Sequence, residues 1–214
     1  MSREEEDGIL NNAADDEDLE DLEDLTDIAD LNEAVEITEQ GLKLNIDLGD
    51  KDHPAPPAVE VTPADLAELA VVEAELDTRW PETKIDPSLE RIELLMDLLG
   101  SPQNSFPSIH VAGTNGKTST VRMIESLLRA FHRRTGRTTS PHLQLVTERI
   151  GIDGVPVHPR DYVRIWREIQ PYVELVDEKS GIRMSKFEVL TAMAYAAFAD
   201  APVDVAVVEV GMGG

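Results

Sequence analysis

A glycine-rich turn between an apolar run and an amphipathic stretch constrains the fold of this 214-residue chain more than any other feature. The apolar run ends at Val111, the turn contains Gly113 and Gly116, and Lys117-Thr118-Ser119 follows directly. Beyond the turn, apolar residues recur at helical spacing as far as Phe131. The pattern predicts a strand, a tight loop and a helix. The N–H groups of the loop and the positive end of the helix would then point to one place.

The side chains of this turn suit phosphate binding. Lys117 adds a full positive charge, and the hydroxyl groups of Thr118 and Ser119 suit a phosphate oxygen or a bound Mg²⁺. The complete phosphate-loop pattern has a glycine where this chain has Val111, so only part of that pattern is present. The alternative interpretation is a glycine-rich turn with a surface lysine. The strand before and the helix after the turn favour nucleotide binding.

Acidic residues are concentrated in the first 60 positions. This segment carries 21 acidic and three basic residues, a net charge of −18, and it has no aromatic residue. Such a segment cannot bury enough apolar surface to offset its chain entropy, so we predict a disordered acidic tail over 1–60. The alternative is a segment that binds a partner, because Leu19, Leu22 and Leu25 share one helical face.

The rest of the chain, residues 61–214, carries 22 acidic and 16 basic residues and is only mildly acidic. Nucleic-acid binding therefore has no electrostatic support. The absence of cysteine excludes disulfides and thiolate metal sites. No apolar run approaches the roughly 20 residues of a membrane span, and the acidic N-terminus is unlike a secretory signal. We therefore expect a cytoplasmic protein with no membrane partner.

Helix and strand signals alternate after residue 61. Helices are expected at 62–80, 88–99, 117–134, 159–176 and 185–198, and strands at 108–111, 136–139, 147–152 and 204–210. Pro171 is expected to kink or interrupt the fourth helix. The last strand is apolar throughout, as in a parallel strand buried on both faces. This order predicts an α/β doubly wound, mostly parallel sheet with ligands at the carboxyl ends of its strands.

Two polar residues interrupt the apolar strands. Glu209 lies near the end of the last strand, where a carboxylate is costly unless it is solvated, paired or bound to a metal. One interpretation is that Glu209 and one or more hydroxyl groups hold Mg²⁺. The other is that it caps a neighbouring helix or pairs with a basic residue. His110 lies within the first strand and is expected to be a core histidine.

Five motifs follow one another in a characteristic order. They are His110–Lys117, Ser140–Leu143, Glu148–Ile150, Phe187–Ala192 and Val208–Gly214. In this order they resemble the folylpolyglutamate synthase/dihydrofolate synthase family of the Mur ligase superfamily, over about residues 60–214. The resemblance implies a P-loop-containing, Mur-ligase-like ATPase domain, with residues 61–214 as its incomplete N-terminal part.

The resemblance implies an ATP-dependent amide ligase. The family adds L-glutamate to dihydropteroate or to the glutamate tail of a folate, in folate biosynthesis and one-carbon metabolism. ATP phosphorylates the acceptor carboxylate, and the amine of glutamate then attacks the acyl phosphate. This chemistry needs positioned phosphates and a divalent ion more than a protein nucleophile. The implied cofactors are ATP and Mg²⁺, and the implied protein is a monomer.

The resemblance also assigns roles to individual residues. Lys117 would be catalytic, and the loop of Asn115, Gly116, Lys117, Thr118 and Ser119 would bind ATP. Ser140 and Glu209 would be Mg²⁺ ligands. The pteroate pocket would be lined by Lys84, Ile85, Asp86, Pro87, Ser185, Lys186, Phe187 and Glu188. From the residues alone, Ser140 could be only a turn residue before a proline, and Glu188 could only complement a helix dipole.

Two other functions compete with the glutamate ligase. A cell-wall Mur ligase has a similar phosphate loop, but Ser140-Pro141-His142 and the glycine-rich sequence after Glu209 argue against it. The second competitor is a noncatalytic nucleotide-binding or regulatory protein. The family has a further C-terminal domain, so this chain looks like an incomplete fragment. We expect it alone to be catalytically dead or nearly so, and marginally stable, with apolar surface of the sheet exposed.

Overall fold

The computed structural model describes residues 59–81 and 88–211 and the backbone of two short strands before them. These strands, β1 (Val35–Thr38) and β2 (Gly41–Leu44), pair antiparallel. They belong to a unit, Met1–Gly49, that is separate from the rest of the chain. This hairpin lies within the expected tail and was not predicted from the sequence. The other residues up to 58 lie outside the described part.

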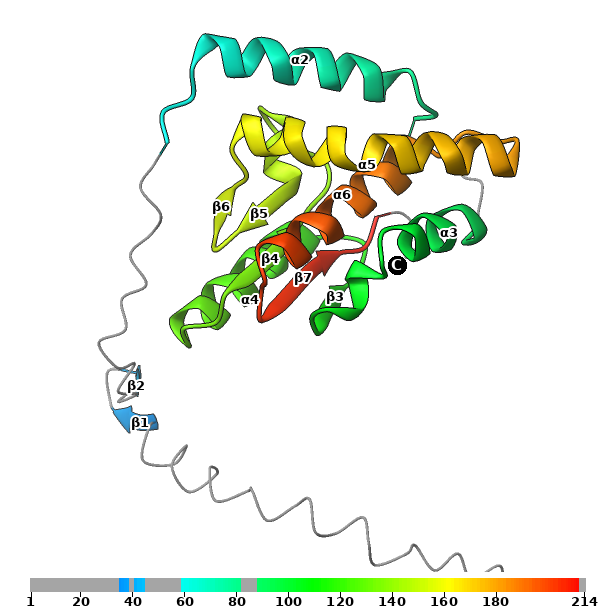
Figure 1. The fold of residues 1–214 in the computed structure, drawn as a ribbon. Coiled ribbons are helices and arrows are strands. Elements are labelled where there is room, and N and C mark those ends of the chain that lie inside the picture. The colour runs from blue at the N-terminus through cyan, green and yellow to red at the C-terminus, as the bar shows by residue number, and fades with distance from the viewer. Residues whose placement is uncertain (1–34, 39–40, 45–58, 82–87, 212–214) are drawn as a thin grey trace, which may run out of the picture. The chain divides into compact units, whose positions relative to one another are not determined.

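The second unit alternates helices and strands (Figure 1). Its helices are α2 (Pro63–Asp77), α3 (Glu90–Leu98), α4 (Lys117–Ala130), α5 (Pro159–Ser180) and α6 (Lys186–Asp200), with short 3-10 helices η2 (Pro102–Asn104) and η3 (Val146–Arg149). Its strands are β3 (Ser108–Val111), β4 (Thr135–Thr138), β5 (Ile150–Ile152), β6 (Val155–Pro156) and β7 (Val205–Glu209).

The five strands form one mixed sheet in the order β3-β7-β4-β5-β6. The first three are parallel, and β5 and β6 join antiparallel at the far side. Val111 lies opposite Glu209, and Thr138 lies opposite Val208, so the three parallel strands end side by side. All residues of β7 are buried. The predicted α/β fold with a parallel centre is confirmed, and its strand ends meet at one edge.

Helices cover both faces of this sheet. A Cβ on Gly136 would lie 2.6 Å from the ring of Phe198 in α6, whereas the next residue, Arg137, binds Glu125 in α4. Since successive side chains of a strand point to opposite faces, α6 and α4 cover opposite faces of the sheet. Beyond α6, α5 packs over it and α2 packs along α5 (Figure 1).

The start of α2 is fixed both locally and to α5. Thr62 and Asp65 form a capping box, in which each side chain accepts a hydrogen bond from the other's backbone N–H. Asp65 also accepts a hydrogen bond from Arg160 at the start of α5. These donors, Arg160 first, hold the pKa of Asp65 well below its usual range. The expected helix start at Thr62 is therefore confirmed.

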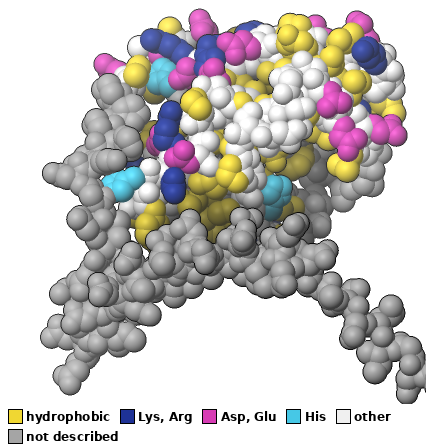
Figure 2. All heavy atoms as spheres, turned by 60° about the horizontal axis from the view of Figure 1, so that its bottom comes forward, with side chains coloured by type: hydrophobic (Ala, Val, Ile, Leu, Met, Phe, Trp, Pro, Cys, Tyr) yellow, Lys and Arg dark blue, Asp and Glu magenta, His cyan; other side chains and the backbone are white. Residues whose placement is uncertain are grey.

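The two faces of the sheet differ in packing. The apolar core lies on the α6 side and includes residues of α2, α3, α5 and α6. On α4, Val121 is fully buried, whereas Met123 and Leu127 are 66 % and 61 % exposed, and Phe131, the C-cap of the helix, is 52 % exposed. Figure 2 brings the lower side of Figure 1 forward and shows hydrophobic side chains gathered on it. The sequence predicted exposed apolar surface on the sheet. Ile109 of β3 is 37 % exposed, but β7 is buried, and the larger exposed apolar side chains on α4 were not predicted.

Three expectations from the sequence are wrong. His110 is exposed rather than in the core, because β3 is the edge strand of the sheet that the described residues form. Pro171 does not interrupt α5, since buried residues on both sides, Ile169 and Val173, hold the helix against the core; a kink at this residue stays a prediction. The expected strand 147–152 is a 3-10 turn followed by three residues of β5. None of the described helices is long and apolar enough to cross a bilayer.

Candidate nucleotide site

The loop between β3 and α4 contains two glycines with positive φ. Gly113 and Gly116 have φ values of +145° and +75°, and Gly116 is the N-cap of α4. A Cβ on either glycine would meet no atom within 4 Å. Glycine is therefore required by the backbone conformation and not by lack of space. The predicted strand, loop and helix are confirmed.

Lys117 lies over this loop. Its Nζ donates a hydrogen bond to the carbonyl oxygen of Gly113, at 2.9 Å. The ammonium group therefore stands beside the N-terminus of α4, where the helix dipole adds partial positive charge. Asn115 and Gly116 are exposed along the same loop. Together these groups form an open site for an anion.

Glu209 joins the loop to the centre of the sheet. It is the last residue of β7 and is 7 % exposed. Its Oε2 accepts hydrogen bonds from the hydroxyl of Thr118, at 2.9 Å, and from the backbone N–H of Ser140, at 3.2 Å. Within the part of the chain that the structure describes, no basic residue forms an ion pair with Glu209 and no donor reaches its Oε1. The alternative that Glu209 pairs with a basic residue therefore has no support here.

The contacts of Glu209 distinguish the hydroxyl group of Thr118 from that of Ser119. Thr118 contacts Glu209, whereas Ser119 is exposed and makes no side-chain hydrogen bond to any described residue. Ser140 reaches Glu209 through its backbone N–H, and its half-buried side chain lies at the end of β4. The sequence had left Thr118 and Ser119 equal, and the structure brings Thr118 to the carboxylate.

The residues around Glu209 supply one carboxylate and two hydroxyl groups to a hard divalent cation. Among residues 59–81 and 88–211, no group of three or more His, Cys, Asp or Glu side chains could hold a metal ion. Glu209 with the hydroxyl groups of Thr118 and Ser140 offers the oxygen ligands that Mg²⁺ prefers. Mg²⁺ usually keeps several waters and adds substrate phosphate oxygens to one or two carboxylates. The donor set matches that kind of site.

The expected acceptor residues at the start of α6 lie near the same strand end. A Cβ on Gly211 would lie 2.9 Å from the ring of Phe187. Gly211 is two positions after Glu209, so the ring lies beside the chain that follows β7. Ser185 caps α6 and shares a capping box with Glu188. Lys186 pairs with Asp77 in α2.

The carboxylate of Glu188 is already engaged within the protein. Its Oε2 accepts hydrogen bonds from the backbone and the hydroxyl of Ser185, both at 2.7 Å, and its Oε1 pairs with Arg91 at 3.1 Å. The helix-start interpretation of Glu188 is thus realised, and its contact with an acceptor stays a prediction. Residues Lys84, Ile85, Asp86 and Pro87 lie outside the described residues.

The hydrogen bonds that shape the loop after Ser140 were not predicted from the sequence. Glu148 accepts three hydrogen bonds from the backbone N–H groups of Leu145, Leu143 and Gln144, at 2.9, 3.0 and 2.8 Å. These bonds lower the pKa of Glu148 to about 2. Leu145, three residues before Glu148, has no side-chain acceptor, so the usual capping pattern is absent and no local signal identified Glu148.

Comparisons with known proteins agree on one family. No family model matches the chain. It is 64 % identical over 173 residues to the dihydrofolate synthase/folylpolyglutamate synthase of Mycobacterium tuberculosis, an alignment that covers 78 % of this chain and 36 % of that protein. The Bacillus subtilis protein of the same name is 37 % identical over 131 residues, which is 61 % of this chain and 30 % of the relative.

Solved structures give the same result. Mycobacterium tuberculosis folylpolyglutamate synthase complexed with ADP matches with a TM-score of 0.68 and 67 % identity, over 70 % of this chain and 33 % of that one. The folylpolyglutamate synthase of Thermotoga maritima matches with a TM-score of 0.63 and 38 % identity, over 70 % and 34 %. The chain therefore spans about a third of the length of the relatives it matches.

Proposed function

We propose a function from the premise that the chain belongs to the dihydrofolate synthase/folylpolyglutamate synthase family. The chain would bind ATP and the substrate that accepts glutamate, as part of an ATP-dependent glutamate ligase. The acceptor would be dihydropteroate or a folate with a glutamate tail, and the amine donor L-glutamate. The observation that carries the proposal is the meeting of Glu209 with Thr118 and Ser140 beside the loop of Lys117. The names of the relatives supply the substrate class.

The proposed reaction has two steps. A carboxylate oxygen of the acceptor forms a bond to the γ-phosphorus of ATP, and ADP leaves. The amine nitrogen of glutamate then forms the amide bond, phosphate leaves, and the amine loses a proton. The protein contributes position and charge at both steps, which can account for much of the barrier reduction without a covalent intermediate on a side chain.

Each loop residue has a role in this proposal. Lys117 and the first N–H groups of α4 offset the negative charge of the phosphates. Asn115, Gly116, Thr118 and Ser119 surround the phosphate chain. Mg²⁺, when bound, would supply positive charge that lowers the repulsion between the phosphates and the incoming carboxylate. Glu209 and the hydroxyl of Ser140 would hold it.

The acceptor is proposed to lie between α6 and the loop after Ser140. The ring of Phe187 is 37 % exposed and stands beside Gly211, so it offers an aromatic surface near the phosphate loop. We expect dihydropteroate to bind the chain and the variant Phe187→Ala to lose at least tenfold in affinity. Equilibrium dialysis measures this. Equal affinity of the variant and the unchanged chain would remove Phe187 from the proposed pocket.

The metal site gives the sharper experiment. ATP affinity is measured by calorimetry with Mg²⁺ and with a chelator present. We expect Mg²⁺ to raise the affinity of the unchanged chain at least tenfold, and Glu209→Gln to lose that gain because it removes the charged ligand. Glu178→Gln, an exposed glutamate in α5, is the matched control and should retain the gain. A full Mg²⁺ effect in Glu209→Gln would refute the metal role.

The expected cytoplasmic location and monomeric state are part of the same proposal. Sedimentation of the 214-residue chain tests the second. A single species of 23.6 kDa is expected at micromolar concentration. A dimer would contradict it.

A further inference from the structure

A second pocket lies on the α4 side of the molecule, apart from the nucleotide site. Its volume is about 470 Å³, within the range of small-ligand sites. It is bounded by α4, β4, the loop at 143–148 and the β5–β6 hairpin. We call it the arginine pocket, and its lining residues are Arg122, Glu125, Ser126, Arg129, Arg137, Leu143, Gln144, Glu148, Gly154 and Pro156.

Two of its three arginines have no acidic partner. Arg122 and Arg129 are two turns apart on α4, and neither forms an ion pair or side-chain hydrogen bond with any of the residues in 59–81 or 88–211. Arg137, from β4, is 4 % exposed and binds Glu125 at 2.7 Å. The pocket therefore has two guanidinium groups available to a ligand.

The two glutamates of the pocket already accept hydrogen bonds within the protein. Glu125 accepts hydrogen bonds from Arg137 and from the backbone N–H of Gly154, at 2.7 and 3.0 Å. Glu148 accepts its three backbone N–H bonds. Neither carboxylate is placed to neutralise Arg122 or Arg129. Three arginines and two glutamates line the pocket, so its charged side chains sum to +1 (3 − 2) in a chain whose net charge is −24.

The other large pocket of the described residues shows the contrast. It lies between α2 and α5 and is also rich in charge. There Arg79 pairs with Asp177 at 3.1 Å, and Glu75 accepts Arg167 at 2.7 Å. Four acidic and two basic side chains line that pocket, so it carries no excess of positive charge. Unmatched positive charge is a property of the arginine pocket and not of charged pockets in this protein generally.

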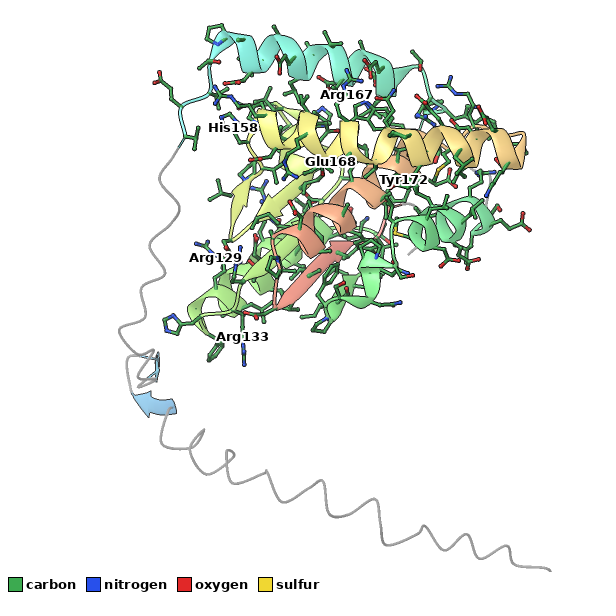
Figure 3. The ribbon with its side chains drawn as sticks, in the orientation of Figure 1. Arg129, Arg133, His158, Arg167, Glu168 and Tyr172 are labelled. Carbon is green, nitrogen blue, oxygen red and sulfur yellow. The ribbon has the colours of Figure 1, made fainter. Side chains whose placement is uncertain are left out.

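Glycines of the β5–β6 hairpin make room for the arginines. A Cβ on Gly151 would lie 2.6 Å from Nη2 of Arg137, and a Cβ on Gly154 would overlap the guanidinium of Arg129. Gly154 also has a φ of +82°, which favours glycine. Arg129 therefore lies against the hairpin backbone at the pocket, whereas Arg133, just beyond α4, is separate from it (Figure 3).

We propose that the arginine pocket binds carboxylate groups of an oligo-γ-glutamate chain, the tail of a folate acceptor. The proposal rests on the proposed function for the identity of the anion. Arginine binds carboxylates with two parallel hydrogen bonds, and Arg122 and Arg129 are on the order of 10 Å apart along α4. They would therefore bind two different carboxylates of one chain.

The position of the pocket suits such a tail. The loop after β4 begins at Ser140, which contacts Glu209, and its residues Leu143 and Gln144 line the arginine pocket. One loop thus borders both sites. A folate whose terminal glutamate lies at the phosphate loop would carry its earlier glutamates around this loop, and the pocket would favour acceptors with longer tails.

The test uses tri-γ-glutamate, which has neither a pterin nor a phosphate. Its binding to the intact 214-residue chain is measured by calorimetry at low salt. Arg122→Gln and Arg129→Gln should each weaken it at least fivefold. Arg133→Gln is the matched control, because it removes an exposed arginine near the same helix that does not line the pocket, and it should change affinity less than twofold. Equal losses in all three variants would overturn the pocket as the site.

Two further arms separate other outcomes. Inorganic phosphate and α-linked triglutamate are titrated in the same way, and both should bind more weakly than tri-γ-glutamate. If phosphate binds the pocket and tri-γ-glutamate does not, the tail proposal is wrong. ATP affinity should be unchanged in Arg122→Gln and Arg129→Gln. If the unchanged chain does not bind ATP, the proposed function is wrong. If it binds ATP but not tri-γ-glutamate, only the proposal for the arginine pocket is wrong.

Discussion

The two faces of the central sheet contrast in what holds them together. On the α6 face, large apolar side chains interlock, as where Phe198 lies edge-on to Phe106 with ring centroids 5.7 Å apart. On the α4 face, a buried ion pair between Glu125 and Arg137 lies under the helix, and much of the apolar stripe of α4 is exposed. One face therefore supplies stability and the other carries the charged groups that suit ligands.

The difference in packing between the two faces follows from the loop at the carboxyl ends of the parallel strands. A phosphate loop needs an open edge, backbone N–H groups without partners and a lysine near the surface, and none of these can be buried under packed apolar side chains. The α6 face has no such requirement and is free to pack densely. The difference between the faces can be tested by substitutions matched in size and type.

The largest expected effect is the loss of a core ring. Phe198→Ala should lower the free energy of unfolding by about 3–5 kcal/mol, because it leaves a cavity against Phe106 and Gly136. Phe131→Ala, at the exposed end of the α4 face, should cost less than about 0.5 kcal/mol. Urea denaturation measures both. Similar losses would mean that the two faces do not differ in packing.

A somewhat smaller effect is expected at the ion pair. Arg137→Met leaves Glu125 buried without its charged partner and should cost about 3 kcal/mol. The double variant Glu125→Leu with Arg137→Met should recover most of this loss, since neither charge then remains buried. If the double variant is as unstable as the single one, the arginine acts through packing and the electrostatic explanation fails.

The smallest expected effect is the pH response of the loop after Ser140. Because backbone donors lower the pKa of Glu148 from 4.5 to about 2, the folded state favours its ionised form. This contribution is fully present above about pH 4.5 and is lost as the pH falls towards 2. Glu148→Gln should remove that part of the acid dependence, measured by urea denaturation between pH 7 and pH 3. An unchanged acid profile would show that these bonds do not stabilise the fold.

Local chemistry allowed much of the site to be predicted. The strand, loop and helix around Lys117 and the cap at Ser185 follow from periodicity and capping, which depend on neighbouring residues. The contact between Thr118 and Glu209 joins residues 91 positions apart, so no local pattern could choose Thr118 over Ser119. For the same reason the buried pair of Glu125 and Arg137 was not predicted.

The predictions for the continuity of α5 and for the burial of His110 were wrong for a related reason. Proline in a helix interior removes a hydrogen bond, which predicts a break at Pro171. Packing of α5 on α2, α3 and α6 nevertheless holds one continuous helix. His110 reads as buried because its neighbours are apolar, but its exposure depends on which strands lie beside β3. Tertiary structure decides both, and it is not contained in a local window of sequence.

The measurement that tests the central claim most directly is the ATP affinity of Lys117→Ala. Calorimetry compares this variant with the unchanged chain in the presence of Mg²⁺, and unfolding curves verify that both are folded. If the loop between β3 and α4 binds the phosphates, the variant should bind ATP at least tenfold more weakly, a loss of about 1.4 kcal/mol, with little change in stability. Equal ATP affinity in the two proteins would contradict the assignment of this loop as a nucleotide site.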